Sequence, residues 1–126
     1  MRLQTGKAIN ALLSANEEVT RMVGERIYPL VSKVDCKFPF IVYQRMSCVP
    51  TYTKDGLIAE EQNYSITVLA DAYSDSVELA DAVRDALELE RGTFSGQYIR
   101  NIKLTSVNES WVSDTYVQEL NFTIEL

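Results

Sequence analysis

Two stretches decide how this chain folds: GERIYP at residues 24–29 and FPFIVYQRMSC at residues 38–48. Pro29 and Pro39 each push the preceding residue into an extended conformation. Neither proline can donate a hydrogen bond to a sheet, so both belong at strand starts or sheet edges. The residues after Pro39 are mostly β-branched or aromatic, which is typical of strands. The pattern therefore predicts a strand over residues 40–48.

The N-terminal segment has the spacing of two short helices. In the first helix, apolar residues recur on one face: Ala8, Ile9, Leu12 and Leu13. The second, EEVTRMV at residues 17–23, starts either at Ser14, which has capping-box spacing to Glu17, or at Asn16. Its first turn is acidic, which suits the helix dipole. Gly24 ends it, because glycine adopts the left-handed conformation without strain.

The sequence beyond the first predicted strand changes from a turn pattern to a strand pattern. Residues 49–63, VPTYTKDGLIAEEQN, are polar around Lys54, Asp55 and Gly56, which predicts a long hairpin loop. Residues 64–73, YSITVLADAY, alternate between apolar and polar side chains, as a half-buried strand does.

The C-terminal part of the sequence predicts one helix and two strands. The helix lies within residues 74–92, with Asp75 as its N-cap and Gly92 as its stop. Its core-facing stripe comprises Leu79, Ala80, Val83, Ala86 and Leu87. A strand at residues 98–107, a turn at residues 108–114 and a strand at residues 115–126 follow.

These elements predict an α+β fold with the order α-α-β-β-α-β-β. Strands joined by hairpins and separated from the helices favour a mostly antiparallel sheet of about four strands under helices. A chain of 126 residues suits a single domain, so we expect residues 1–126 to form one.

Composition narrows the classes of partner. Lys and Arg number 12 against 18 Asp and Glu, a net charge of −6, and the basic residues are scattered. Because nucleic-acid affinity comes mainly from Lys and Arg on phosphates, we expect no sequence-specific nucleic-acid binding. No apolar run reaches the ~18 residues of a membrane span, and the N-terminus lacks a secretory pattern, so we expect a cytosolic protein with no membrane partner.

Few residues have the pattern of a catalytic or metal site. The chain has no histidine, and its five glycines form no phosphate-binding motif, so we expect neither an enzyme nor a cofactor. Asp71, among apolar strand residues, is the best single candidate for a perturbed carboxylate, although a strand-end role also fits. Cys36 and Cys48 suit free, partly buried thiols; a cross-strand disulfide is the alternative, and a zinc site lacks ligands.

The aromatic residues fall into two groups. Those in the predicted strands suit the core and the sheet: Tyr28, Phe38, Phe40 and Tyr43. Tyr52 and Trp111 lie in predicted loops, where a large side chain either packs locally or meets a partner, because both residue types are enriched at interface hot spots. With Lys54 and Asp55 at the adjacent turn, they are the candidate partner contacts.

The order of these segments resembles the phage tail-completion family, also called tail-to-head joining proteins. The similar stretches are GERIYP, FPFIVYQRMS, PTYTKDG, YSDSVELADAVRDAL and the closing ELNFTIEL. The resemblance runs from about residue 8 to residue 126, and it rests on the order and spacing of short patterns. The segments SITVLAD and GLIAEEQN depart from the family pattern.

The resemblance implies a structural protein of the virion neck, assembled in the host cytoplasm. Family members are thought to form a ring, typically six-fold, through which DNA passes. Such a ring contacts the head connector or stopper protein on one face and the tail terminator or tail tube on the other. An acidic channel would suit passing DNA, because like charges repel. The alternative is an interaction module of a mobile element that stays outside the virion.

Overall fold

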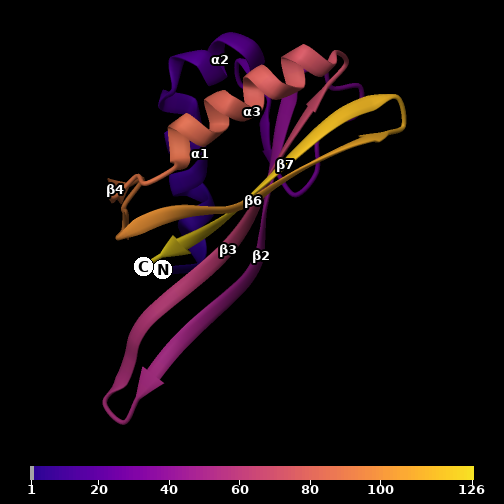
Figure 1. Cartoon of the computed structure of the whole chain (residues 1–126). Coiled ribbons are helices and arrows are strands. Elements are labelled where there is room, and N and C mark those ends of the chain that lie inside the picture. The colour runs from indigo at the N-terminus through magenta and orange to yellow at the C-terminus, as the bar shows by residue number, and fades with distance from the viewer. Residues whose placement is uncertain (1) are drawn as a thin grey trace.

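The computed structural model describes residues 2–126 (Figure 1). A 3-10 turn, η1, precedes three helices and seven strands. In chain order they are η1 (Arg2–Gln4), α1 (Thr5–Ala15), α2 (Glu17–Val23), β1 (Ile27–Pro29), β2 (Phe40–Thr53), β3 (Gly56–Ala70), α3 (Tyr73–Leu87), β4 (Gly92–Phe94), β5 (Gln97–Ile99), β6 (Asn101–Val112) and β7 (Thr115–Glu125).

Five of the strands form one sheet in the order β1-β2-β3-β7-β6. Only the short β1 runs parallel to its neighbour; the other pairs are antiparallel. The helices lie together on one face of this sheet, and β4 pairs with β5 in a separate small hairpin. The predicted α+β class and mostly antiparallel sheet are confirmed.

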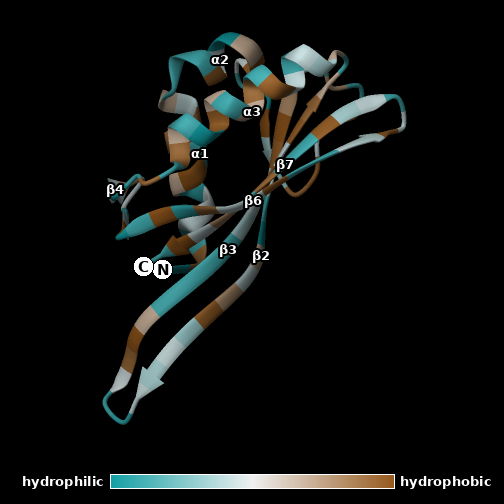
Figure 2. Cartoon of the chain, in the orientation of Figure 1, coloured by the Kyte–Doolittle hydropathy of each residue, from teal (hydrophilic) through white to brown (hydrophobic). Residues whose placement is uncertain are grey.

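The core lies between the helices and the sheet, where apolar residues of both layers face one another (Figure 2). The predicted stripe of α3 is buried in full, and in α1 all of the predicted face is buried except Leu12, which packs against the core. The predicted alternation also holds in β7, where Leu120, Phe122 and Ile124 are buried. Gln118 is buried in the same row. The sequence pattern did not predict its burial, because its side chain is polar.

Two predicted loops are wrong. Residues 49–63 belong mostly to β2 and β3, which pair as far as Thr53 and Gly56, so the turn is confined to Lys54 and Asp55. Likewise β6 continues to Val112 and only residues 113–114 form its turn. The physical reason is that cross-strand pairing stabilises a polar strand as well as an apolar one, and such pairing is invisible in the composition of one segment.

Other predicted boundaries shift by a few residues. Helix α3 begins at Tyr73 with Ala72 as its N-cap, and none of the described side chains caps it, so the predicted cap at Asp75 is wrong. Pro29 ends β1, whereas Pro39 directly precedes β2 as predicted. Three-residue strands such as β1 are too short to leave a periodic pattern, which is why β1, β4 and β5 were not predicted.

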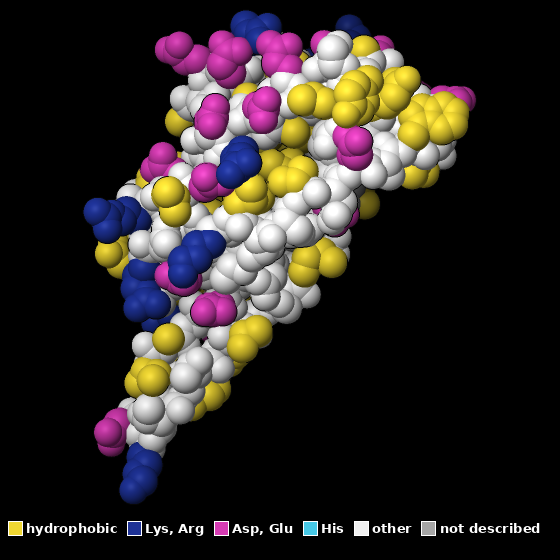
Figure 3. Space-filling model, viewed as in Figure 1, with side chains coloured by type: hydrophobic (Ala, Val, Ile, Leu, Met, Phe, Trp, Pro, Cys, Tyr) yellow, Lys and Arg dark blue, Asp and Glu magenta, His cyan; other side chains and the backbone are white. Residues whose placement is uncertain are grey.

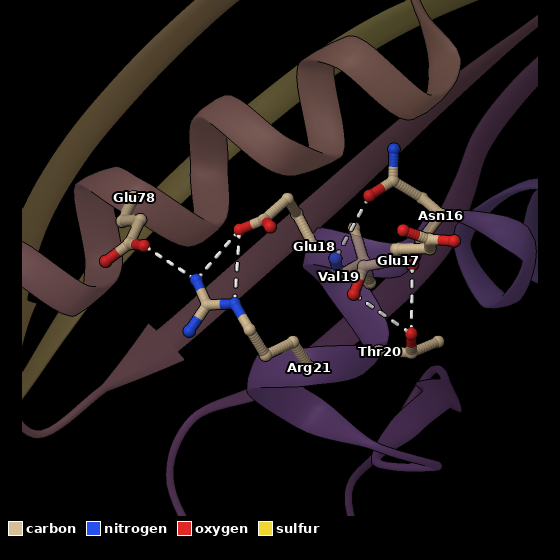
Figure 4. A network of polar contacts seen from close by, with 7 residues as sticks. All are labelled: Asn16, Glu17, Glu18, Val19, Thr20, Arg21 and Glu78. Carbon is tan, nitrogen blue, oxygen red and sulfur yellow. Dashed lines mark hydrogen bonds and ion pairs between the residues drawn. The ribbon is translucent and has the colours of Figure 1, made fainter.

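Asn16, one of the two predicted candidates, is the N-cap of α2. Its side chain accepts a hydrogen bond from the Val19 amide at 3.1 Å, whereas the Ser14 hydroxyl donates to Asn10 within α1. Arg21, one helical turn into α2, contacts Glu18 and also Glu78 of α3, each at 2.8 Å (Figure 4). This exposed ion pair links the two helices but contributes little stability beside the packed core.

None of the helices within residues 2–126 is both long and apolar enough to cross a membrane.

We expect Asn16→Ala to lower the free energy of unfolding by about 1 kcal/mol, because the Val19 amide loses its only capping partner among the described residues. Ser14→Ala is the matched control, since that hydroxyl caps no backbone amide of α2, and it should change stability much less. Urea unfolding measures both values. Equal losses from the two variants would contradict the assignment of the cap to Asn16.

Candidate partner-binding hairpin ends

Two hairpin ends extend the sheet in opposite directions (Figure 1). Because β2 and β6 run antiparallel within one sheet, their turns lie at opposite ends of the molecule. We name residues 51–59 the β2–β3 arm and residues 109–118 the β6–β7 tip. The last contact between the C-terminal strand and β3 is the hydrogen bond from the Leu126 amide to the Glu60 carbonyl, at 2.9 Å. The arm begins beyond this contact.

Among the described residues 2–126, the β2–β3 arm is a two-stranded ribbon with no third strand beside it. Tyr52 is 68% exposed and pairs across the ribbon with Leu57, and Ile58 is 60% exposed. The turn residues Lys54 and Asp55 place one charge of each sign at its end, as Figure 3 shows beside the hydrophobic side chains of the arm. An isolated two-stranded hairpin is marginally stable in water, so this arm needs support from its base or from a partner.

A buried polar cluster supplies the support at the base of the arm. The Thr5 hydroxyl donates to Gln62 Oε1 and lies 2.7 Å from the Tyr64 hydroxyl. Gln62 Nε2 in turn donates to the Arg2 carbonyl at 2.9 Å and to Glu60 Oε2 at 2.8 Å. The cluster therefore ties the start of α1 to β3 where the arm begins.

A second polar cluster fixes the β6–β7 tip against α3. Glu109 Oε2 accepts hydrogen bonds from the Tyr73 hydroxyl at 2.9 Å and from Gln118 Nε2 at 3.0 Å. The Tyr73 ring meets the Tyr116 ring edge-on, with centroids 5.9 Å apart. Trp111 pairs with Tyr116 across the hairpin and is 60% exposed. Together with the side chains of the cluster, it lines a hollow of about 270 Å³.

Hydrogen bonding tunes both ionisable groups of this cluster. The bonds from Gln118 and Tyr73 stabilise the carboxylate and hold the pKa of Glu109 below its ordinary value. The same bond to Glu109 raises the pKa of the Tyr73 hydroxyl.

The structure divides the four predicted contact residues between the two ends. Tyr52, Lys54 and Asp55 lie on the β2–β3 arm, and Trp111 lies on the β6–β7 tip, so they form no common site. The sequence analysis missed the polar group around Trp111, because Tyr73 and Glu109 are distant in sequence and meet only through folding. Whether Tyr52 and Trp111 contact a partner stays a prediction.

The remaining candidates occupy ordinary structural positions. Both cysteines are free, as predicted, and burial raises the pKa of the Cys48 thiol, with the Glu60 carboxylate adding to the effect. Asp71 is exposed just after β3. Within residues 2–126, no three Cys, Asp or Glu side chains gather into a group that could hold a metal ion.

The predicted aromatic core is confirmed only in part. Phe40 and Tyr43 are buried, whereas Tyr28 is half-buried and Phe38 is 40% exposed. Phe38 and Phe40 pack together at a centroid distance of 5.4 Å, so Phe38 covers the beginning of β2 from outside the core.

We expect Gln62→Leu to lower the free energy of unfolding by about 1–3 kcal/mol, since Glu60 and the Arg2 carbonyl lose a buried donor. Asn63→Leu is the control: it changes the next residue of β3, whose hydrogen bonds lie on the opposite and more exposed face. Chemical denaturation measures both variants. A Gln62 variant as stable as the wild type would show that the cluster does not hold the arm.

Acidification should weaken the β6–β7 tip through Glu109. Its pKa is lowered in the folded protein, so the stabilisation is complete above the ordinary carboxyl pKa and is lost as pH falls through the folded value. The difference in unfolding free energy between wild type and Glu109→Gln should therefore shrink on acidification. Trp111 fluorescence, followed against pH, should change in the wild type and stay flat in the variant.

One solved structure resembles the chain closely in fold. It comes from the virion of a native gene transfer agent particle, with a TM-score of 0.82 over 94% of this chain and 90% of that chain. The identity is 20%, so the likeness concerns the fold. No curated protein matches the chain significantly.

The sequence itself identifies the family. The family model described as tail completion protein gp17 matches residues 7–124, which is nearly the whole chain and agrees with the resemblance found in the segment order. Such a family makes the protein a structural component of a virion. We conclude that the chain belongs to the family of phage tail completion proteins.

Proposed function

We propose that this protein forms a ring, six-fold as the resemblance to its family implies, in the neck of the virion. The ring joins the tail tube to the head connector during assembly in the host cytoplasm, and DNA passes through it. The observation that supports this most strongly is the pair of hairpin ends, which point in opposite directions and each carry an exposed aromatic residue, Tyr52 or Trp111.

A joining protein must bind on two sides at once. The β2–β3 arm and the β6–β7 tip meet this requirement, because each extends from a core that holds its base with buried or partly buried hydrogen bonds. In this proposal Tyr52, Lys54, Asp55 and Trp111 contact other virion proteins: further copies of the chain, the connector or stopper protein, and the tail terminator or tube.

The face of the sheet without helices suits a channel for DNA. Its side chains form polar rows across the strands, such as Ser47, Asn63 and Thr123, which are linked by hydrogen bonds of 2.8 and 2.7 Å. On the same face Lys103 is paired with Glu125 at 3.0 Å, which reduces its attraction for phosphates. A polar lining with paired cations would let DNA slide without strong binding.

We expect Tyr52→Ala and Trp111→Ala each to reduce head–tail joining while leaving the fold intact. Truncating an interface hot spot costs about 2 kcal/mol, or roughly a 30-fold loss in affinity. Electron microscopy of lysates should show unjoined heads and tails, and infectivity should fall accordingly. Circular dichroism checks the fold of each purified variant.

Tyr98→Ala is the matched control, because Tyr98 is 58% exposed but lies on β5, away from both hairpin ends. It should leave joining unchanged. If both hairpin variants join heads to tails as well as the control does, the proposed contacts are wrong. If the protein is missing from purified particles, the proposed neck function itself is wrong.

A further inference from the structure

One edge of the main sheet, along β6, is open. It is the last strand of the sheet, and within residues 2–126 its outer edge meets only the Leu89 amide, which donates to the Ile102 carbonyl at 2.7 Å. Every residue from 105 to 112 is exposed. Open edges with exposed apolar side chains attract other strands, and natural proteins usually cover or block them.

The opposite edge, along β2, is also open for most of its length. The short β1 pairs only with residues 41–43, and the Leu30 amide then donates to the Tyr43 carbonyl at 2.9 Å. Beyond that point no described strand pairs with the outer edge of β2, which continues to Thr53. The free lengths therefore match: residues 44–53 on β2 and residues 103–112 on β6.

The directions of these two edges are compatible between copies. Because β2 and β6 run antiparallel within the sheet, β2 of a second copy placed beside β6 in the same orientation forms an antiparallel pair. The contact uses different surfaces on the two copies, so it is heterologous and repeats around a ring when the rotation closes.

Each free edge contains one β-bulge. In the inferred pair, the extra residue in one strand is matched by an extra residue in the other. The register shifts between Arg45 and Ser47 in β2, and between Leu104 and Ser106 in β6. Pairing Val112 with Gln44 at one end and Lys103 with Thr53 at the other then keeps the helix-side and open faces aligned over the full length. A pairing that ran straight through both bulges would place helix-side residues of one strand opposite open-face residues of the other between them.

This register brings exposed and half-buried apolar side chains of the two copies together on the helix side. Val107, which is 45% exposed, meets Pro50, which packs against it but has no N–H to donate to the new ladder. Leu104 meets Tyr52, which is 68% exposed. Trp111 lies beside Arg45, an arrangement suited to a cation–π contact. The β2–β3 arm thereby gains the third strand that it lacks in the single chain.

The offset between copies is also reasonable for a closed sheet. The inferred pairing displaces the second copy along the strand direction. Followed across the sheet from one β2 to the next, the displacement is about six residues, or about 20 Å. Four strand spacings separate one β2 from the next, which is about 19 Å across the sheet. Because this distance nearly equals the displacement along the strands, the strands tilt by about 45° to the ring axis. Closed sheets have tilts of about 35–45°.

We infer that β6 of one copy pairs antiparallel with residues 44–53 of β2 in the next copy, so that a continuous sheet runs around the ring. This inference rests on the proposed ring and names the contact that builds it. Tyr52 and Trp111 then lie at one interface, each contributed by a different copy.

Engineered disulfides test the register in assembled particles. In a chain with Cys36→Ser and Cys48→Ser, we expect Ser47→Cys with Ser110→Cys to cross-link neighbouring copies, because these exposed serines face each other in the inferred pair. Mild oxidation of purified particles followed by a non-reducing gel should show a ladder of multimers. Ser47→Cys with Ser106→Cys is the control; it places the thiols too far apart and should give roughly tenfold less cross-linked protein.

The outcomes separate the inference from the proposed function. A ladder with the first pair alone supports the inferred register. Particles that contain the variant but give no ladder overturn the inference and leave the neck function standing. Dimers from Ser110→Cys alone would also overturn it, because they require two copies of β6 to meet symmetrically. Particles that lack the protein altogether contradict the proposed function.

Discussion

Strand β3 pairs with β2 along one side and with β7 along the other, and this double pairing determines the rest of the molecule. Its helix-side row, which includes Ile66 and Val68, is buried against the helices, so the register on both sides is fixed by one apolar pattern. Slipping either neighbour by one residue would turn the apolar row of that neighbour toward water. Because β7 ends near Glu61 while β2 and β3 continue, the same pairing produces the projecting arm.

Each hairpin end is held by polar side chains rather than by the apolar core. Gln62 sits at the centre of one cluster and Glu109 at the centre of the other, and both receive partners from the helical layer. Gln62 is buried, and a buried polar group is costly unless it is paired, so its cluster permits few alternative arrangements. Glu109 is exposed, but it accepts a hydrogen bond from the buried Gln118. Contacts from the helical layer thus help to fix the direction of both ends, as the proposed joining function requires.

The core and the family could be predicted because their signals are local. The α3 stripe and the alternation of β3 and β7 follow directly from side-chain periodicity, and the segment order identifies the family. The hairpin ends could not be predicted as strands. Residues 51–59 are polar or mixed, and those on either side of the turn are extended because residues of β2 pair with residues of β3.

By itself, then, the sequence determined the helices, the central strands and the sheet they form, because burial imposes a period on the residues of each element. Only the tertiary structure decided where Tyr52 and Trp111 lie, how Glu109 meets Tyr73, and which edges of the sheet stay open. These features depend on contacts between two or more segments. Such contacts leave no periodic pattern in either segment, so only the folded chain reveals them.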